Sequence, residues 1–241
     1  EIMFQDPSTI AAFIMEPIQG AGGVIVPDAS FMKLARDICD KHGILMISDE
    51  VITGFGRTGD WSGARHWGVQ PDMMTVAKGI TSAYFPVGAT LVNAKMAETF
   101  ESDQSGEGSI WHGYTYSAHP VGMAAVNACV SETLRLDLKS NAAVRGTQLY
   151  EGLKALQVDF DIIGDVRGGH GLMAAIELVS DRGTKAPLEM GVIKRAHKAT
   201  YEAGTMVRIG GNNLLMSPPL VVTEADIAKI LADLRRGLSA L

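Results

Sequence analysis

Two charged residues directly follow apolar runs, and together their side chains could do chemistry. Asp49 comes after the run at residues 44–47 and one serine, and Lys78 comes after the run at residues 73–77. Short apolar runs are typical of strands in a parallel sheet, and open α/β sheets bind ligands at the carboxyl ends of their strands. A carboxylate and an ammonium group are costly there unless each is paired or bound to something charged. The pattern leaves two interpretations: a structural pair or solvent-facing residues, or a ligand site with an amine nucleophile.

The neighbouring segments predict the elements that position these residues. An apolar run at residues 9–15, ended by Glu16 and Pro17, predicts a strand buried on both faces. Ser30 and Gly43 bracket a helical pattern, as N-cap and C-cap residues do. Further strands are predicted at residues 44–47, 73–77 and 87–92. This order predicts the α/β class, with a mainly parallel sheet in the first part of the chain.

The second part of the chain has a different rhythm. A helix is predicted from residue 121 to 134, continuing irregularly toward residue 156. Beyond Asp161, short strands at residues 171–178, 205–209 and 213–216 and helices near 188–202 and 224–238 indicate a smaller α+β unit. We therefore predict a large domain over residues 1–140 and a small C-terminal domain over residues 141–241.

Composition disfavours several classes of protein. The 241 residues include 21 basic and 27 acidic side chains, a net charge of −6 without a Lys/Arg cluster, which disfavours nucleic acid as a partner. The uncharged segment 108–131 contains His, Tyr, Ser and Pro residues that a membrane span would not tolerate. Two cysteines without a C-x-x-C spacing favour a reducing, cytoplasmic setting. The amino terminus does not resemble an initiation site, so we expect a fragment of a longer protein.

Five motifs occur in a fixed order along the chain. They are Glu-Pro-Ile-Gln-Gly at residues 16–20, Ser-Asp-Glu-Val at 48–51, Gly-Phe-Gly-Arg-Thr-Gly at 54–59, Ala-Lys-Gly at 77–79 and His-Gly-Tyr-Thr-Tyr-Ser at 112–117. From about residue 8 to the carboxyl end, the chain resembles the class III aminotransferases, pyridoxal-phosphate enzymes of fold type I. Thr-Ser-Ala-Tyr at residues 81–84 and the Tyr-Thr-Tyr-Ser string resemble the ω-transaminases that use pyruvate as amino acceptor. The expected fold is part of the large domain of a fold type I transferase, followed by the smaller α+β domain.

The resemblance implies roles around the cofactor, pyridoxal 5′-phosphate. Lys78 would hold the cofactor through a Schiff base and afterwards move a proton as general base and acid. Asp49 would accept the hydrogen bond of the protonated pyridine nitrogen, and the β-branched Val51 would pack against the ring. Gln19 resembles the residue near the phenolic oxygen, and Glu16 would lie on the substrate side.

Other residues are implied for the substrate and for a second subunit. Arg208 resembles the mobile arginine that binds a substrate carboxylate, and Tyr84 would shape the smaller side of the pocket. Thr115 resembles the residue that reaches the partner's cofactor phosphate, which implies a homodimer. Arg57, within its glycine-rich turn, is interpreted as a residue that staples the turn. The substrates implied are an amine or ω-amino acid donor and a keto acid acceptor.

Two family elements are absent from this sequence, and several alternatives stay open. The phosphate-binding loop and the aromatic that stacks on the cofactor ring normally precede the first strand, so the chain resembles the carboxyl-terminal half of an aminotransferase. A racemase or aminomutase would use the same Lys78 and Asp49, and a catalytically incomplete fragment is a further alternative. A dehydrogenase is the remaining rival, because residues 169–174 have the form Gly-x-Gly-x-x-Ala. That fingerprint requires a following helix, whereas these residues lead into a predicted strand.

Overall fold

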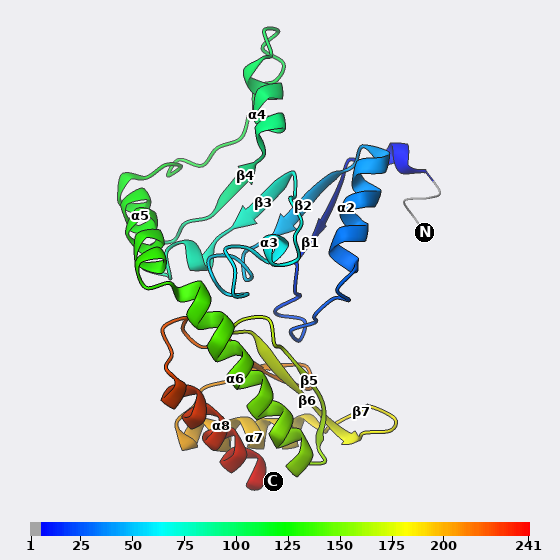
Figure 1. Cartoon of the computed structure of the whole chain (residues 1–241), viewed down its shortest axis with the longest axis vertical. Helices are drawn as coiled ribbons and strands as arrows, with labels where there is room; N and C mark the ends of the chain where they lie inside the picture. Colours follow the sequence, from blue (N-terminus) through cyan, green and yellow to red (C-terminus); the bar gives the residue numbers. More distant parts are fainter. Residues whose placement is uncertain (1–5) are drawn as a thin grey trace. The chain divides into compact units, whose positions relative to one another are not determined.

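The computed structural model of the protein describes residues 6–241, which form two compact units (Figure 1). Within the described residues, the first unit runs up to Pro17 and continues with Pro27–Phe55 and Ser62–Leu136. The second unit consists of Ile18–Val26, Gly56–Trp61 and Asp137–Leu241. The predicted division into domains 1–140 and 141–241 stays a prediction, and each unit is described by itself.

The first unit contains a mixed sheet with the strand order β1-β2-β3-β4. Strands β1, β2 and β3 are parallel, and β4 is antiparallel to β3. This confirms the predicted α/β class with a mainly parallel sheet. The elements are η1 (Pro7–Thr9), β1 (Ala12–Met15), α2 (Phe31–His42), β2 (Leu45–Asp49), α3 (Gly63–His66), β3 (Met73–Val76), η2 (Lys78–Ile80), β4 (Ala89–Val92), α4 (Ala94–Glu101) and α5 (Pro120–Arg135).

Helix α2 forms where the sequence predicts it. Ser30 is at the N-cap position, but its hydroxyl donates to Asp28 at 2.6 Å and makes no capping hydrogen bond. The C-cap is Gly43, whose φ of 69° lies in the left-handed region that glycine adopts without strain. The buried face of the helix consists of Met32, Ala35 and Cys39, which are spaced three and four residues apart. These side chains belong to one core cluster with Met46 of β2, so α2 covers one face of the sheet.

The other face of this sheet is open, which corrects the prediction that residues 9–15 are buried on both faces. Ile14 in β1 is 58% exposed, and all of β4 is exposed. Successive residues of a strand point to opposite faces. Phe13 and Met15 pack into the core cluster around Met32 and Met46, whereas Ala12 and Ile14 point away from it. An apolar run therefore forms a strand covered on one face only.

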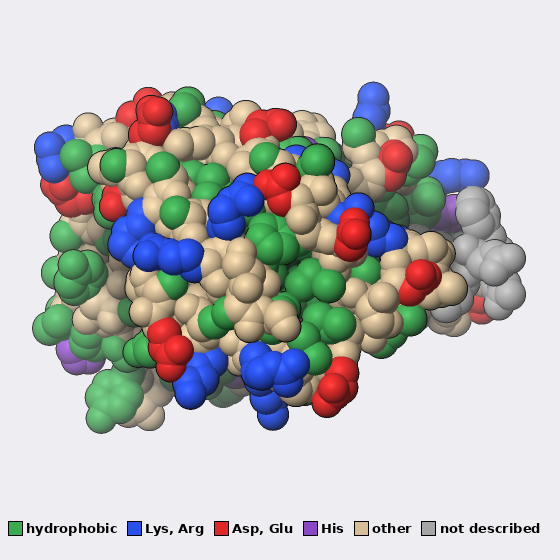
Figure 2. Space-filling model, turned by 90° about the horizontal axis from the view of Figure 1, so that it is seen from below, with side chains coloured by type: hydrophobic (Ala, Val, Ile, Leu, Met, Phe, Trp, Pro, Cys, Tyr) green, Lys and Arg blue, Asp and Glu red, His purple; other side chains and the backbone are tan. Residues whose placement is uncertain are grey.

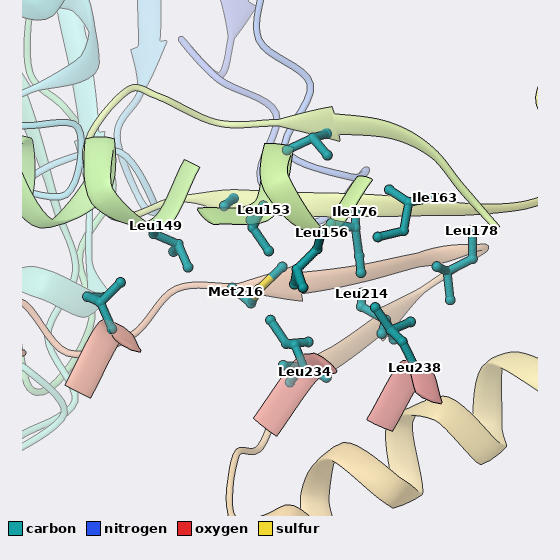
Figure 3. Packing of buried hydrophobic residues seen from close by; sticks show 14 of the residues in the cluster. Leu149, Leu153, Leu156, Ile163, Ile176, Leu178, Leu214, Met216, Leu234 and Leu238 are labelled. Atoms are coloured by element: carbon teal, nitrogen blue, oxygen red, sulfur yellow. The ribbon is translucent and has the colours of Figure 1, made fainter. Parts of the chain in front are cut away.

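The second unit is built on an antiparallel sheet with the order β5-β6-β9-β8, and β7 pairs with β6. Its elements are α6 (Leu138–Asp159), β5 (Ile163–Arg167), β6 (Ala174–Asp181), β7 (Ala186–Pro187), α7 (Met190–Ala203), β8 (Arg208–Gly210), β9 (Asn213–Met216) and α8 (Glu224–Ser239). Leucines of α6 and α8 point toward apolar residues of β6 and β9 (Figure 3). The predicted α+β character of this part of the chain is thus confirmed, but the unit is about as large as the first one and not smaller.

The helix predicted to continue irregularly beyond residue 134 is instead interrupted. Helix α5 ends at Arg135, and α6 begins at Leu138. Between them Asp137 has a φ of 47°, which an α-helix cannot accommodate. The chain therefore uses two helices, one in each unit, where periodicity alone indicates a single irregular one.

On the surface shown in Figure 2, Lys and Arg side chains are interspersed with Asp and Glu side chains and with apolar ones. Among residues 6–241, no helix has the length and apolar character needed to cross a membrane.

Candidate functional site

The carboxyl edge of the parallel strands brings three of the predicted site residues together. Asp49 is the last residue of β2, and Lys78 follows β3 after one further residue. Glu16 directly follows β1, whose last residue, Met15, pairs with Ser48. Because the strands are parallel, their carboxyl ends lie at one edge of the sheet. These residues therefore lie at the ends of their strands, as the sequence predicts.

Asp49 lies on the open face of the sheet. Its register partner on β3 is Thr75, which pairs in turn with Thr90 on β4. Side chains of register partners share a face, and this face is the one opposite to Met46 and α2. Asp49 is half-buried, and its Oδ1 accepts the backbone N–H of Val51 at 3.1 Å. The carboxylate therefore keeps further lone pairs available beside an open surface.

Lys78 stands where the chain turns sharply after β3. Its φ is 42°, an uncommon conformation for a residue with a side chain, and Ala77 before it is extended. Lys78 is exposed, and no ion pair joins it to Asp49 in the described part of the chain. The interpretation of these two residues as a structural pair is therefore wrong, and both remain available to a ligand.

Val51 belongs to the turn that follows Asp49, and this turn is anchored by a residue that the sequence reasoning missed. Glu50 is buried, and its carboxylate accepts hydrogen bonds from the turn, from β2 and from the first residues of α3. The available signal was a glutamate between Ser48 and Thr53 at the end of an apolar strand. That pattern does not reveal the α3 residues that complete the network.

Tyr84 and Thr115 lie in two exposed turns of the first unit. Tyr84 is 88% exposed, in a turn closed by the hydrogen bond from Thr81 Oγ1 to the Phe85 carbonyl at 2.7 Å. Thr115 lies in a turn closed by the hydrogen bond from Ser117 N to Tyr114 O at 2.9 Å. Phe85 and His119 stack with ring centroids 5.4 Å apart, and this contact links the two turns.

Gln19 belongs to the second unit, in a glycine-rich loop closed on itself. Backbone hydrogen bonds join Gln19 to Ile25 in both directions, at 3.1 and 2.9 Å. Arg167 of β5 donates from Nε to the Gly23 carbonyl at 2.7 Å and from Nη2 to Asn213 Oδ1. The loop that carries Gln19 is thereby fixed to β5 and β9. Gln19 itself is exposed.

Arg208 is the first residue of β8, and its side chain is exposed. The backbone before it is anchored, because the ring of His197 hydrogen-bonds the Val207 carbonyl at 2.9 Å and Thr205 Oγ1 donates to Asp233 at 2.7 Å. Arg208 also pairs with Leu215 of β9. The freedom expected of this residue therefore lies in its side chain, since its backbone is held by β9 and by the anchored residues that precede it.

Arg57 has a structural role, as interpreted from the sequence, but it fastens its turn to two other segments of the second unit. Its Nη1 donates to the carbonyls of Leu172 at 3.0 Å and Pro218 at 2.6 Å. Desolvation lowers the pKa of Arg57 to about 10, so the guanidinium still carries its charge at neutral pH. Two carbonyl partners from distant segments give it a structural role in the second unit.

The glycine string at residues 169–174 does not form a dinucleotide site. It leads into strand β6, not into a helix. Gly171 has a φ of 67° and lies against Arg57 and Gly59, so that a side chain there would meet the backbone of this turn. Gly171 serves close packing, and the dehydrogenase interpretation fails because a strand follows the string.

Comparison with known proteins agrees with this arrangement. The family described as aminotransferase class-III matches residues 2–238. The chain is 38% identical to a taurine–pyruvate aminotransferase of Bilophila wadsworthia, over 100% of this chain and 54% of that protein. The chain thus spans about half the length of the curated relatives it matches.

Solved structures give the same result. An amine transaminase from an uncultivated Pseudomonas species, in its PLP-bound form, has 45% identity and a TM-score of 0.95, covering 99% of this chain and 54% of its own. An (S)-enantioselective ω-transaminase from Thermomicrobium roseum has 40% identity and a TM-score of 0.92, covering 99% of this chain and 53% of its own. Because the family model matches nearly the whole of this chain, the chain belongs to the class III aminotransferases.

Proposed function

We propose that this chain supplies the lysine and the pyridine-binding carboxylate of a pyridoxal-phosphate-dependent aminotransferase. The enzyme would move an amino group from an amine or ω-amino acid to a keto acid such as pyruvate. Family membership and relatives named for taurine, pyruvate and amines support this proposal. Since the chain spans about half of these relatives, the activity of the whole protein is part of the proposal.

The observation that carries the proposal is that Asp49 and Lys78 lie at the same edge of the sheet and form no ion pair with each other. The chemistry of these groups fits the cofactor, which needs an amine for its aldehyde and an anion for its pyridinium nitrogen. A buried orphan atom supports the fit. Thr75 Oγ1, on the same face as Asp49, has no hydrogen-bond partner among the described residues. A bound polar group at this face would satisfy it.

When bound, pyridoxal phosphate stores the electron pair released from the substrate carbon. Asp49 would keep a proton on the ring nitrogen by accepting its hydrogen bond. Val51, held in the turn that follows, would pack against the ring. Lys78 would bind the cofactor and, once released from it, carry a proton from Nζ to and from the substrate.

The remaining residues are proposed for the substrate and for the rest of the cofactor. Arg208 has the long stem and the bidentate guanidinium that suit a carboxylate, and its side chain is exposed. Glu16, at the same sheet edge as Asp49, would face the substrate, and Tyr84 would shape the smaller pocket. Gln19 would lie near the phenolic oxygen of the cofactor.

A homodimer is part of the proposal. Thr115 lies in an exposed turn next to Trp111, Tyr114 and Tyr116, and all three aromatic side chains are exposed. Exposed aromatic side chains on one segment are typical of an interface. In the dimer, Thr115 would reach the cofactor phosphate of the partner subunit. A cytoplasmic location is also proposed, in keeping with two free cysteines.

Borohydride reduction in the presence of pyridoxal phosphate tests the proposal. Peptide mapping should place the reduced cofactor on Lys78, and Lys78→Ala should lose the label while Lys33→Ala, on the surface of α2, should keep it. The experiment is carried out on this chain and on a version extended to the length of its relatives. A label on another lysine in the extended version would contradict the proposal.

A racemase or aminomutase would use the same two residues, so the reaction must be followed separately. Transfer of the amino group to pyruvate, with alanine formed in step with donor consumption, is expected. Scrambling of donor stereochemistry or migration of the amino group without a keto acid would indicate the alternative. An extended version that binds the cofactor without either reaction would indicate an incomplete enzyme.

A further inference from the structure

Glu50 is a buried carboxylate that the proposed chemistry leaves without a role. It is 1% exposed, although it directly follows the half-buried Asp49. Four donors converge on its two oxygens, one hydroxyl and one backbone N–H on each: Ser48 Oγ at 2.8 Å and Ala64 N at 2.8 Å on Oε1, and Thr53 Oγ1 at 2.5 Å and Gly63 N at 2.7 Å on Oε2. Because the backbone N–H groups of Gly63 and Ala64 can only donate, both oxygens of Glu50 must act as acceptors in this site.

The partners of Glu50 come from three different segments. Ser48 belongs to β2, Thr53 to the turn after it, and Gly63 with Ala64 to the start of α3. The backbone of Glu50 adds a fourth connection, since its N–H donates to the Thr75 carbonyl of β3 at 2.8 Å. This one residue therefore cross-links β2, β3 and α3 immediately beside Asp49.

We propose that Glu50 is a positioning residue, whose carboxylate fixes the end of β2 and the following turn so that Asp49 and Val51 keep one orientation. The inference rests on the proposed function, in which Asp49 meets the cofactor nitrogen. Successive strand residues point to opposite faces, so Glu50 is locked into the covered side of the sheet while Asp49 faces the open side. A fully satisfied buried network resists rearrangement, and its rigidity passes to the adjacent residue through the backbone.

Glu50→Gln tests this role with almost no change in volume. The amide replaces one oxygen by a donor. The hydroxyl of Ser48 or Thr53 can rotate and accept a hydrogen bond from the new NH₂ group. The backbone N–H of Gly63 or Ala64 on the same side cannot accept, so one buried donor loses its partner. Ser48→Ala is a milder variant, which keeps the carboxylate and removes one donor.

Asp72→Asn is the matched control at the opposite end of the same strands. Asp72 directly precedes β3, and its carboxylate accepts the Met46 N–H at 2.8 Å and pairs with Arg36 at 2.7 Å. Its loss weakens the same sheet and leaves the edge with Asp49 and Lys78 untouched. A purely structural effect should therefore be equal in both variants.

The experiment uses the protein at its full natural length, loaded with pyridoxal phosphate labelled with ¹⁵N at the ring nitrogen. Both Glu50→Gln and Asp72→Asn should lower the melting temperature. In Glu50→Gln but not in Asp72→Asn, the ring nitrogen should lose its proton at lower pH, as its ¹⁵N shift reports, and kcat should fall about tenfold with little change in KM for the donor. Ser48→Ala should show the same changes, smaller in size.

The inference would be overturned if Glu50→Gln had the same ring-nitrogen titration and the same kcat as the wild-type protein. Equal changes in Asp72→Asn would overturn it too, and Glu50 would then have only a structural role. Failure of the proposed function is visible separately. If the wild-type protein carries no cofactor on Lys78 after borohydride reduction, the proposed function fails and this inference with it.

Discussion

Asp49 and Glu50 are consecutive carboxylates with opposite surroundings. Glu50 has every lone-pair direction occupied by a donor, and Asp49 accepts one backbone N–H within the described chain. The alternation of strand side chains between the two sheet faces produces this difference. At the residue scale, the proposed chemistry therefore depends on one carboxylate being fixed and its neighbour being available.

Asp49→Asn should leave pyridoxal-phosphate binding partly intact and reduce turnover on the order of 100-fold. The amide is neutral and no longer stabilises the proton on the ring nitrogen. Cofactor affinity by absorbance titration and kcat with a saturating donor check this, with Asp40→Asn on the exposed face of α2 as control. Near-normal turnover in Asp49→Asn would show that the residue has another role.

Arg208→Ala should raise KM for the keto acid acceptor strongly and affect uncharged amine donors much less. Losing one partner of a desolvated charged pair costs about 2 to 5 kcal/mol. Steady-state kinetics for each half-reaction measure the two effects, and Arg195→Ala on the exposed face of α7 is the matched control. Equal losses for both substrates would make Arg208 a scaffold residue and would remove the support for a pyruvate-type enzyme.

At the scale of elements, the strand that carries Arg208 depends on an ionic cluster at α8. Asp233 is fully buried, and its carboxylate accepts from Lys229, Thr205 and Arg236. Desolvation raises the pKa of Asp233, but these hydrogen bonds and the neighbouring charges outweigh it and hold the pKa below its usual value. The cluster joins α8 to the segment that leads into β8.

This lowered pKa predicts an acid-dependent stability of the second unit. A carboxyl with a depressed folded-state pKa contributes stability that is complete above its unfolded value, near 3.8, and is lost as pH falls through the folded value. Asp233→Asn should therefore lower the urea midpoint at pH 7, and its difference from wild type should shrink below about pH 4. Chemical denaturation at several pH values measures this. A difference that stays constant down to pH 2 would mean that the charge of Asp233 does not contribute.

At the scale of the whole molecule, the proposed homodimer can be tested by mixing subunits. Thr115→Val should weaken pyridoxal-phosphate binding by about 1 kcal/mol, roughly fivefold, through one lost hydrogen bond. In a mixed dimer, one subunit carries Thr115→Val and the other carries Lys78→Ala. The site of the first subunit then combines its intact Lys78 with Thr115 of the partner subunit, so wild-type affinity should return at that site. Thr99→Val, on exposed α4, is the control. Unchanged weak binding after mixing would place Thr115 in its own subunit's site or outside the site.

The sequence by itself determined the features that depend on neighbouring residues. The end of α2 at Gly43 and the positions of Asp49 and Lys78 after their apolar runs follow from local periodicity, glycine placement and residue type. These are short-range effects, in which the chain needs no information about distant segments.

Only the tertiary structure decided which residues share a face and which distant groups meet. The register of β2 against β3 places Thr75 beside Asp49, and this register is set by the packing of whole strands. Glu50 meets the N–H groups of Gly63 and Ala64, which lie 13 and 14 positions later in the chain. Such contacts appear only once a sheet and a helix have packed together, because no local pattern encodes the partner of a buried charge.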